Sequence, residues 1–301
     1  MASLFLPSSL HEREPDEQDG IKFWSTQPAS YDGVLGGFGK GSLPRVDSLG
    51  SRQFLQFMLP ELCTIPSAIR PLEVRPKERR TRVLDVGAGI GRVTADVLLH
   101  LFDDVILLEP VESLIREAFV RGTASENLSP STSNPSSTTE SDEPPPSKWK
   151  GIADGSKSVA FFQNSLQAFD PAHPTRSTDV IGRVGFVPDL PTSDLESGFD
   201  VIWCQWCLMY MNKADLVAFL KRSKAALREP GRSIIGVKEN VCRDGEGGVP
   251  CINFDEEDSS LTRSDLAWKE IFKEAGLSVV HEQVQLGLPE GLYMVKMYAI
   301  R

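Results

Sequence analysis

The stretch VLDVGAGIGR, residues 83–92, decides how the chain folds. Its first half is short, apolar and β-branched, which predicts a buried strand. Gly87, Gly89 and Gly91 follow at alternate positions, and glycines there let the backbone approach a ligand closely. The spacing of apolar residues beyond the turn predicts an amphipathic helix over 91–102. A strand, a glycine-rich turn and a helix N-terminus together indicate a site for an anionic group.

The next predicted strand, VILLE at 105–109, ends in a carboxylate. Glu109 lies 18 residues beyond Gly91, where α/β nucleotide-binding proteins place the acid that binds the ribose hydroxyls. The glycine spacing is G-x-G-x-G, whereas dinucleotide-binding proteins use G-x-G-x-x-G. With Asp85 just before it, the turn therefore resembles that of class I S-adenosylmethionine-dependent methyltransferases rather than that of a dinucleotide enzyme.

Strands and helices alternate along most of the chain. Further strands are predicted at 159–164, 199–206, 232–240, 277–285 and 293–301. Further helices are predicted from residue 51 to 62 and over 111–120, 213–231 and 261–277. The expected fold is α/β and Rossmann-like, with a mostly parallel seven-stranded sheet, helices on both faces and a C-terminal antiparallel hairpin. An N-terminal helical extension is expected to precede it.

One methyltransferase domain is predicted over 21–301, after a flexible N-terminus over 1–20. Its first part, 21–62, is expected to form an extension on the substrate side. Residues 122–158 are rich in Ser, Thr and Pro, so they cannot bury enough apolar surface to offset their ordering entropy, and a disordered insertion is predicted. Loops are predicted over 63–80 and, as a Pro- and Gly-rich insertion, over 170–198.

The composition excludes several classes of protein. The 301 residues include 32 Lys and Arg against 42 Asp and Glu, a net charge of −10, which argues against binding to nucleic acid or an anionic membrane. No apolar run reaches the roughly 18 residues of a membrane helix, and no signal or transit peptide is recognisable. Five cysteines in 301 residues suit a reducing compartment, so a cytoplasmic or nuclear protein is expected. Cys204 and Cys207 form a C-x-x-C without a second pair, and no metal site is predicted.

Several further segments narrow the resemblance. Phe23-Trp24 precedes YDGVLGGFG at 31–39, and later come SRQFL, DVIWCQW, FLKRSKAAL, Glu239-Asn240, FDEEDSSLTRSD and GLPEGLYMVKMYAIR. This ordered set resembles the eukaryotic protein N-terminal methyltransferases, which methylate the α-amino group of proteins beginning Xaa-Pro-Lys. The resemblance covers nearly the whole chain except 1–20, 63–80, 122–158 and 171–197. It implies S-adenosylmethionine as cofactor and protein substrates with free Xaa-Pro-Lys N-termini, for example ribosomal proteins.

The resemblance also implies which residues bind the cofactor: Gly87, Arg92, Glu109, Pro110, Leu166, Gln167 and Gln205. Arg92 suits the methionyl carboxylate because a guanidinium matches carboxylate geometry. Glu109 would bind the ribose, and Leu166 and Gln167 would lie beside the adenine. From the residues alone, Leu166 could instead belong to the core and Arg92 could be a solvated residue at a helix start.

The implied substrate channel consists of Trp24, Leu35, Gly36, Trp206, Asn240, Asp255, Asp258, Ser260 and Tyr293. Asp255 would favour a lysine at the third substrate position, where Ser260 could also bond, and Trp206 would pack on the proline. Aromatic walls accommodate a methylated ammonium by cation–π attraction. Without the resemblance, FDEEDSS could equally be a solvated acidic loop before a helix, Trp206 a core residue, and Phe23 and Trp24 a packing anchor.

Three residues are implied in catalysis: Asn240 to hold the amine, Asp258 to accept its proton, and Tyr210. Family members often have a histidine four residues after the tryptophan that Trp206 matches, and here that residue is Tyr210. A tyrosine with a pKa near 10 is a poor base at neutral pH, which puts more of the proton transfer on Asp258 and can alter the degree of methylation. Phe23 also stands where an aromatic residue with a hydroxyl is common.

Two other functions fit the sequence. One is a methyltransferase for a different acceptor, such as a small molecule or a lysine side chain. The other is a non-catalytic module that keeps the fold and binds Xaa-Pro-Lys N-termini. The complete glycine turn at 87–92 and the presence of Asp258 favour the enzyme.

Overall fold

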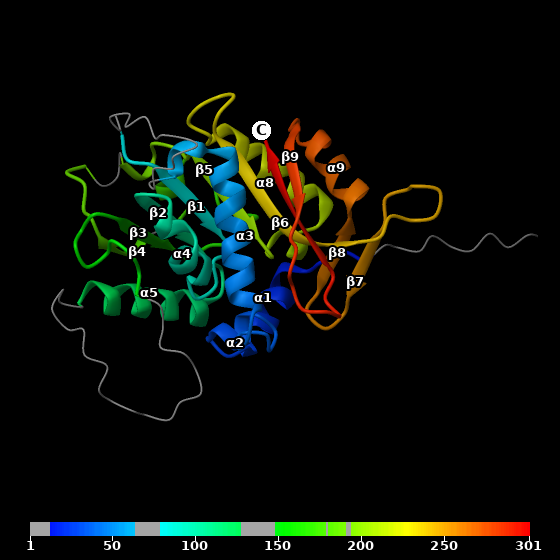
Figure 1. The fold of residues 1–301 in the computed structure, drawn as a ribbon, viewed down its shortest axis with the longest axis horizontal. Helices are drawn as coiled ribbons and strands as arrows, with labels where there is room; N and C mark the ends of the chain where they lie inside the picture. The colour runs from blue at the N-terminus through cyan, green and yellow to red at the C-terminus, as the bar shows by residue number, and fades with distance from the viewer. Residues whose placement is uncertain (1–12, 64–78, 128–147, 179, 191–193) are drawn as a thin grey trace, which may run out of the picture.

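The computed structural model describes residues 13–63, 79–127, 148–178, 180–190 and 194–301. Figure 1 shows a central twisted sheet with helices on both of its faces. The strands are β1 (Arg82–Val86), β2 (Asp104–Leu108), β3 (Ser158–Phe162), β4 (Val180–Gly185), β5 (Val201–Gln205), β6 (Ile234–Cys242), β7 (Ile252–Asp255), β8 (Ser260–Ser264), β9 (Val279–Val284) and β10 (Met294–Ile300).

The main path of the sheet runs β4-β3-β2-β1-β5-β6-β10-β9. Strands β3, β2, β1, β5 and β6 are parallel, and β10 is antiparallel to both β6 and β9. This confirms the predicted α/β fold with its C-terminal hairpin. Within the described residues the sheet has ten strands rather than seven, because β4 and the β7–β8 hairpin add to the predicted set.

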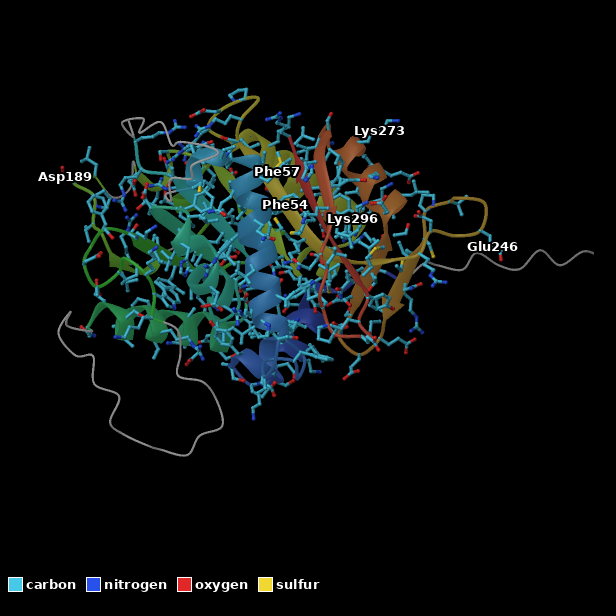
Figure 2. The ribbon with its side chains drawn as sticks, in the orientation of Figure 1. Phe54, Phe57, Asp189, Glu246, Lys273 and Lys296 are labelled. Atoms are coloured by element: carbon cyan, nitrogen blue, oxygen red, sulfur yellow. The ribbon has the colours of Figure 1, made fainter. Side chains whose placement is uncertain are left out.

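Every residue of β1, β2, β3 and β5 is buried, as expected for parallel strands covered on both faces. On one face the core includes residues of α8 (Lys213–Ala225) and α9 (Asp265–Glu274). On the other it includes residues of α3 (Leu43–Met58) and α5 (Glu112–Glu126). Phe54 of α3 is fully buried, 6.2 Å from the Trp203 ring, whereas Phe57, one turn on, is 65% exposed (Figure 2).

The N-terminal extension is helical, as predicted, but it begins earlier. Helix α1 spans Glu17–Thr26, followed by α2 (Tyr31–Val34) and α3. Asp16 caps α1 by accepting hydrogen bonds from the backbone N–H groups of Gln18 and Asp19. The predicted flexible boundary at residue 20 is therefore wrong, and Gly20 is buried within the helix. Residues 1–12 lie outside the described part of the chain.

The predicted insertions contain regular structure at their edges. Helix α5 continues to Glu126, and Trp149 and Ile152 are buried, so the insertion predicted over 122–158 is ordered at both ends, while 128–147 lies outside the described residues. The loop predicted over 170–198 contains α6 (Pro174–Ser177) and β4, which pairs antiparallel with β3. The sequence of β4 contains two glycines, so its residue pattern does not predict a strand. Of the loop predicted over 63–80, residues 64–78 are not described.

Three predicted helices are shorter than expected, and the one predicted over 213–231 ends, as α8, at Ala225. The helix predicted over 91–102 divides into α4 (Arg92–Asp96) and the 3₁₀ turn η2 (Leu98–His100), because Val97 leaves helical geometry with φ −125° and ψ −63°. The helix predicted over 261–277 starts only at Asp265, where the Ser264 hydroxyl caps it by accepting from the Ala267 N–H. The residues before it form β8. No helix of the described segments is long and apolar enough to cross a membrane.

Candidate active site

The glycine turn after β1 has a backbone that only glycine adopts without strain. Gly87 has φ 61°, and a Cβ atom there would lie 2.4 Å from the Cys207 Cβ. Gly91 has φ 76°, and its Cβ would lie 2.7 Å from the Trp149 ring. The turn leads directly into α4, so its backbone borders the cavity at a helix N-terminus.

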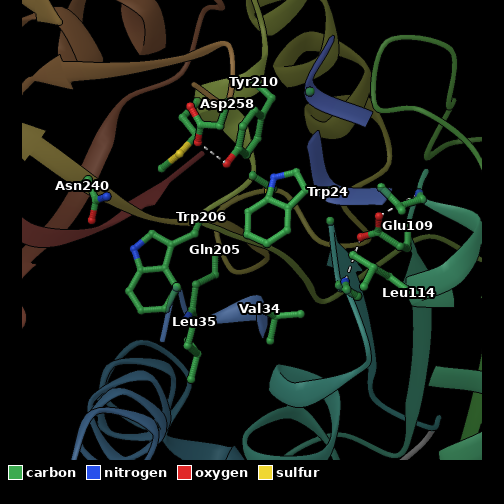
Figure 3. Close-up of a pocket in the computed structure, with 18 of the residues that line it drawn as sticks. Trp24, Val34, Leu35, Glu109, Leu114, Gln205, Trp206, Tyr210, Asn240 and Asp258 are labelled. Carbon is green, nitrogen blue, oxygen red and sulfur yellow. Dashed lines mark hydrogen bonds between the residues drawn. The ribbon is translucent and has the colours of Figure 1, made fainter. Parts of the chain in front are cut away.

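Glu109 follows β2 and is fixed beside this turn. Its two carboxylate oxygens accept hydrogen bonds of 2.8 Å from the backbone N–H groups of Gly89 and Val111 (Figure 3). Burial raises the pKa of Glu109 to about 7, against the lowering effect of those two bonds. A carboxylate held in this way is suited to accept hydrogen bonds from a diol such as a ribose.

A cavity of about 420 Å³ opens at the carboxyl ends of the parallel strands. Helix α1 and the segment between β9 and β10 also contribute to its wall, through Trp24 and Tyr293. All of the predicted site residues except Asp255 and Ser260 line it: Trp24, Leu35, Gly36, Gly87, Arg92, Glu109, Pro110, Leu166, Gln167, Gln205, Trp206, Tyr210, Asn240, Asp258 and Tyr293. The residues predicted to bind the cofactor and those predicted to bind the substrate thus line the same cavity.

Leu166 and Gln167 lie in the segment after β3, and Arg222 of α8 fixes their backbone. Its guanidinium donates to the Leu166 carbonyl at 3.0 Å and to the Gln167 carbonyl at 2.9 Å. Leu166 is buried and belongs to the core cluster on the α8 side, so it is both a core residue and a residue of the cavity wall.

Arg92 is buried rather than solvated, because a carboxylate from α3 meets it. Its Nη1 lies 2.7 Å from Oδ2 of Asp47. The Gln205 amide donates to both Asp47 oxygens, at 3.0 and 2.9 Å, and Lys238 Nζ lies 2.5 Å from Oδ1. Arg92 and Gln205 line the cavity, whereas Asp47 and Lys238 lie behind them. Sequence analysis missed both hidden residues, although a lysine within the apolar strand RSIIGVKEN was a usable signal.

Aromatic side chains form the other half of the cavity. The rings of Trp24 and Tyr210 meet edge to face with centroids 6.2 Å apart. The Arg92 guanidinium lies 5.7 Å from the centroid of the Trp206 ring, within the range of a cation–π contact. Trp206 is only partly buried and has a left-handed backbone, φ 53°. It therefore belongs to the cavity wall rather than to the core clusters (Figure 3).

Tyr210 and Asp258 form a pair at this wall. The Tyr210 hydroxyl donates to Oδ2 of Asp258 at 2.9 Å (Figure 3). Oδ1 of Asp258 is buried and has no hydrogen-bond partner among the described residues. Burial, followed by the nearby Asp258 charge, raises the pKa of Tyr210 well above its usual value. Tyr210 is therefore a hydrogen-bond donor and not a base.

Glu239 positions the segment that carries Trp206 and Tyr210. Its Oε1 accepts from the backbone N–H groups of Cys207 and Leu208 at 3.0 and 2.9 Å, at the start of the 3₁₀ turn η3 (Leu208–Tyr210). Burial raises the pKa of Glu239 to about 7, against those two bonds. Sequence analysis used Glu239 only to identify the family and did not foresee this role.

Asp255 and Ser260 do not line the cavity. They face each other across the base of the β7–β8 hairpin, whose turn carries Asp258. Asp255 is exposed and accepts a hydrogen bond from the Glu257 N–H, while Ser260 is buried at the start of β8. The alternative of a solvated acidic loop thus describes Asp255 and Glu257 but not Asp258, which points into the cavity. The substrate roles of Asp255 and Ser260 remain predictions.

The groups around the cavity match the parts of S-adenosylmethionine. The anchored carboxylate of Glu109 suits the ribose, and the buried guanidinium of Arg92 suits the methionyl carboxylate. Apolar side chains such as Val111 and Leu114 suit the adenine. Within the described residues, no group of three or more His, Cys, Asp or Glu side chains is placed to hold a metal ion. Cys204 and Cys207 are buried free thiols.

The sequence matches the family described as AdoMet dependent proline di-methyltransferase over residues 12–133 and 150–301. It is 33% identical to Alpha N-terminal protein methyltransferase 1 of Arabidopsis thaliana, over 94% of this chain and 78% of that protein. It is 29% identical to N-terminal Xaa-Pro-Lys N-methyltransferase 1-B of Xenopus laevis, over 93% of this chain and 92% of that protein.

A solved structure of a SAM-dependent methyltransferase from Leishmania major superposes with a TM-score of 0.61 at 28% identity, covering 94% of this chain and 82% of that one. The fold, the cavity and these similarities agree. The chain belongs to the family of AdoMet-dependent proline di-methyltransferases and uses S-adenosylmethionine as its cofactor.

Proposed function

We propose that this enzyme methylates the free α-amino group of proteins whose N-terminus reads Xaa-Pro-Lys, to the di- or trimethyl form. The observation that carries the proposal is the buried, unpartnered Oδ1 of Asp258 in the same cavity as the cofactor turn. Relatives named for N-terminal methylation, several of them for Xaa-Pro-Lys, support the acceptor.

The reaction requires a neutral amine. A protein N-terminus has a pKa of about 8, so it is largely protonated at neutral pH and must lose a proton before its lone pair can attack. The bound cofactor supplies the electrophilic methyl carbon. We assign the proton to Oδ1 of Asp258, and we assign Asn240 to hold the amine through its amide oxygen. Catalysis then consists mainly of positioning and the removal of one proton for each methyl group added.

The cavity wall supports selection of the first substrate residues. Trp206 offers a flat apolar surface for the proline ring, and Trp24 offers a second aromatic face for a methylated ammonium. Asp255 lies outside the cavity on the same hairpin as Asp258, so we assign it, with Ser260, to a lysine at the third position, beyond the enclosed part of the site.

We infer that the substrates include abundant proteins with this N-terminus, such as ribosomal proteins. We also propose a cytoplasmic or nuclear location. Free thiols at Cys204, Cys207, Cys242 and Cys251 suit the reducing conditions of those compartments.

The test is mass spectrometry of peptides incubated with the enzyme and S-adenosylmethionine. The set comprises peptides beginning Ser-Pro-Lys and Pro-Pro-Lys, their N-acetylated forms, and versions with glutamate in place of the third-position lysine. We expect a gain of methyl mass only on the free-amine peptides that contain lysine. Methylation of the acetylated peptides would move the acceptor to a side chain.

A calorimetric titration with S-adenosylhomocysteine separates the remaining outcomes. Cofactor binding without methylation of any peptide would overturn the proposed acceptor and leave the fold and the cofactor unchanged. Absence of both would favour the non-catalytic module.

A further inference from the structure

Lys238 is a fully buried cation that does not line the cavity. It lies in β6, directly beside Gln205 of β5, with no exposed surface. Its Nζ lies 2.5 Å from Oδ1 of Asp47, 2.9 Å from the Ser51 hydroxyl and 3.1 Å from Oε1 of Gln285. All the hydrogens of the ammonium are therefore directed at acceptors, as a buried charge requires.

Asp47 joins this ammonium to Arg92. One carboxylate oxygen lies against Lys238 and the other lies 2.7 Å from Arg92. Burial would raise the pKa of Asp47, but the charges of Arg92 and Lys238 outweigh it and hold that pKa below its usual value. Burial lowers the pKa of Lys238, and the Asp47 charge opposes this. One ionised carboxylate thus faces two cations.

Lys238, Asp47 and Arg92 together carry one positive charge in excess, and this charge lies beside the cavity. Arg92 is 5% exposed, and it is the member of the cluster that lines the cavity wall. Asp85 interacts electrostatically with Arg92, but its carboxyl accepts a 2.6 Å bond from Thr94 and burial raises its pKa to about 7, so it offsets that charge only in part near neutral pH. An uncompensated buried charge is costly, and an anionic ligand group beside it removes that cost.

We propose that Lys238 is a positioning residue for the cofactor carboxylate. By binding Asp47, Lys238 prevents that carboxylate from neutralising Arg92, so the cluster keeps the positive charge that attracts the methionyl end of the cofactor. If Lys238 were absent, Asp47 and Arg92 would form a closed neutral pair. The proposal rests on the cofactor assignment alone and is independent of the methyl acceptor.

A charge series tests it by calorimetric titration at pH 7.5. Lys238→Met makes the cluster neutral, Asp47→Asn leaves two positive charges, and the double variant restores a single one on Arg92. Each protein is titrated with S-adenosylhomocysteine and with 5′-methylthioadenosine, which keeps the nucleoside and the sulfur but lacks the amino-acid end. We expect Lys238→Met to weaken S-adenosylhomocysteine binding by at least 10-fold while methylthioadenosine binding changes by less than about 3-fold. The double variant should recover most of the loss.

Lys296→Met is the matched control. Lys296, labelled in Figure 2, is a largely buried lysine in β10 that pairs at 2.6 Å with Asp265 and does not itself line the cavity. This variant should keep the wild-type ratio of the two affinities. Lys238→Gln retains a polar group beside Ser51 and provides a second neutral variant if the methionine protein does not fold. Its S-adenosylhomocysteine affinity should fall relative to its methylthioadenosine affinity, as in Lys238→Met.

An equal loss of affinity for both ligands in a folded Lys238 variant would overturn the proposal, because it would indicate a general packing defect. A double variant that binds S-adenosylhomocysteine no better than Lys238→Met would also overturn it. Neither result depends on peptide methylation, so failure here is distinct from failure of the proposed function.

Discussion

The Tyr210 hydroxyl donates a 2.9 Å hydrogen bond to one oxygen of Asp258, while the other oxygen is buried without a partner among the described residues. Two residues on different elements, η3 and the β7–β8 hairpin, thus share one part of the cavity wall, where Asp258 keeps one oxygen without a partner among the described residues. A raised pKa removes Tyr210 as a base, so the proton acceptor of this pair is Asp258, without the second acceptor that a histidine at position 210 would supply.

The first prediction concerns Tyr210. Tyr210→Phe removes the bond that orients Asp258, and we expect kcat to fall by about 10- to 100-fold, because a hydrogen bond to a charged group contributes roughly 1.5–3 kcal/mol. Tyr210→His places a group with an ordinary pKa of about 6.5 at the same position. Its pH–rate profile should gain an ionisation between pH 6 and 7 that wild type and Tyr210→Phe both lack. An ionisation that is present in wild type and lost in Tyr210→Phe would contradict the assignment of Tyr210 as a donor only.

The second prediction separates the two aspartates of the hairpin. Asp258→Asn should lower kcat by about 10² to 10⁴, the usual contribution of a general base, with cofactor affinity retained. Asp255→Asn is the matched substitution three residues away. It should preserve kcat and raise KM only for peptides with lysine at the third position. Steady-state kinetics on lysine and glutamine peptides measure both, and a loss of kcat in Asp255→Asn would show that the exposed residue acts in the chemistry.

How far the sequence predicts this molecule depends on the range of the interactions involved. Strands β1, β2 and β5 are buried on both faces, so each is a mostly apolar run that the local pattern reveals. Strand β4 is an edge strand with exposed Val180 and Ile181 and two glycines, and its pairing with β3 leaves no such pattern.

The residues of the site also divide into those that local sequence predicts and those that it does not. Glu109 follows from its spacing to the glycine turn, because one βαβ unit fixes both. Asp47 and Lys238 are 191 residues apart, so no local pattern shows that they pair, although Lys238 stands within an apolar strand. Asp258 lies in an acidic run whose other members are solvated, so only the resemblance to a family distinguished it.

The third prediction is a pH dependence of cofactor binding. Burial raises the pKa of Glu109 to about 7, so below that pH the side chain is mostly protonated and accepts ribose hydrogen bonds less well. S-adenosylhomocysteine affinity should therefore rise as the pH increases from 6 to 8, by up to about 10-fold for each unit below 7. Glu109→Gln should bind more weakly at pH 8 and lose most of this dependence. A wild-type affinity that is flat over that range would show that the ionised form is not required.

The fourth prediction uses Glu239, whose pKa burial raises from 4.5 to about 7. A carboxyl with a raised pKa in the folded state favours folding below its unfolded value, and that contribution is lost as the pH rises through 7. Above pH 7 the native protein holds a buried carboxylate with Oε2 unpartnered among the described residues, and the nearest opposing charge is Arg263. Glu239→Gln removes the ionisation and keeps an oxygen for the Cys207 and Leu208 N–H groups.

We expect the free energy of unfolding of Glu239→Gln, relative to wild type, to increase by about 2–3 kcal/mol between pH 5 and pH 8, since each pKa unit is worth about 1.4 kcal/mol. Urea unfolding at the two pH values measures this change. Glu246→Gln, at an exposed glutamate in the loop between β6 and β7 (Figure 2), is the control and should show no such dependence. A difference that stays constant with pH would mean that Glu239 is already ionised in the native state at pH 5, with Arg263 as its effective counter-charge.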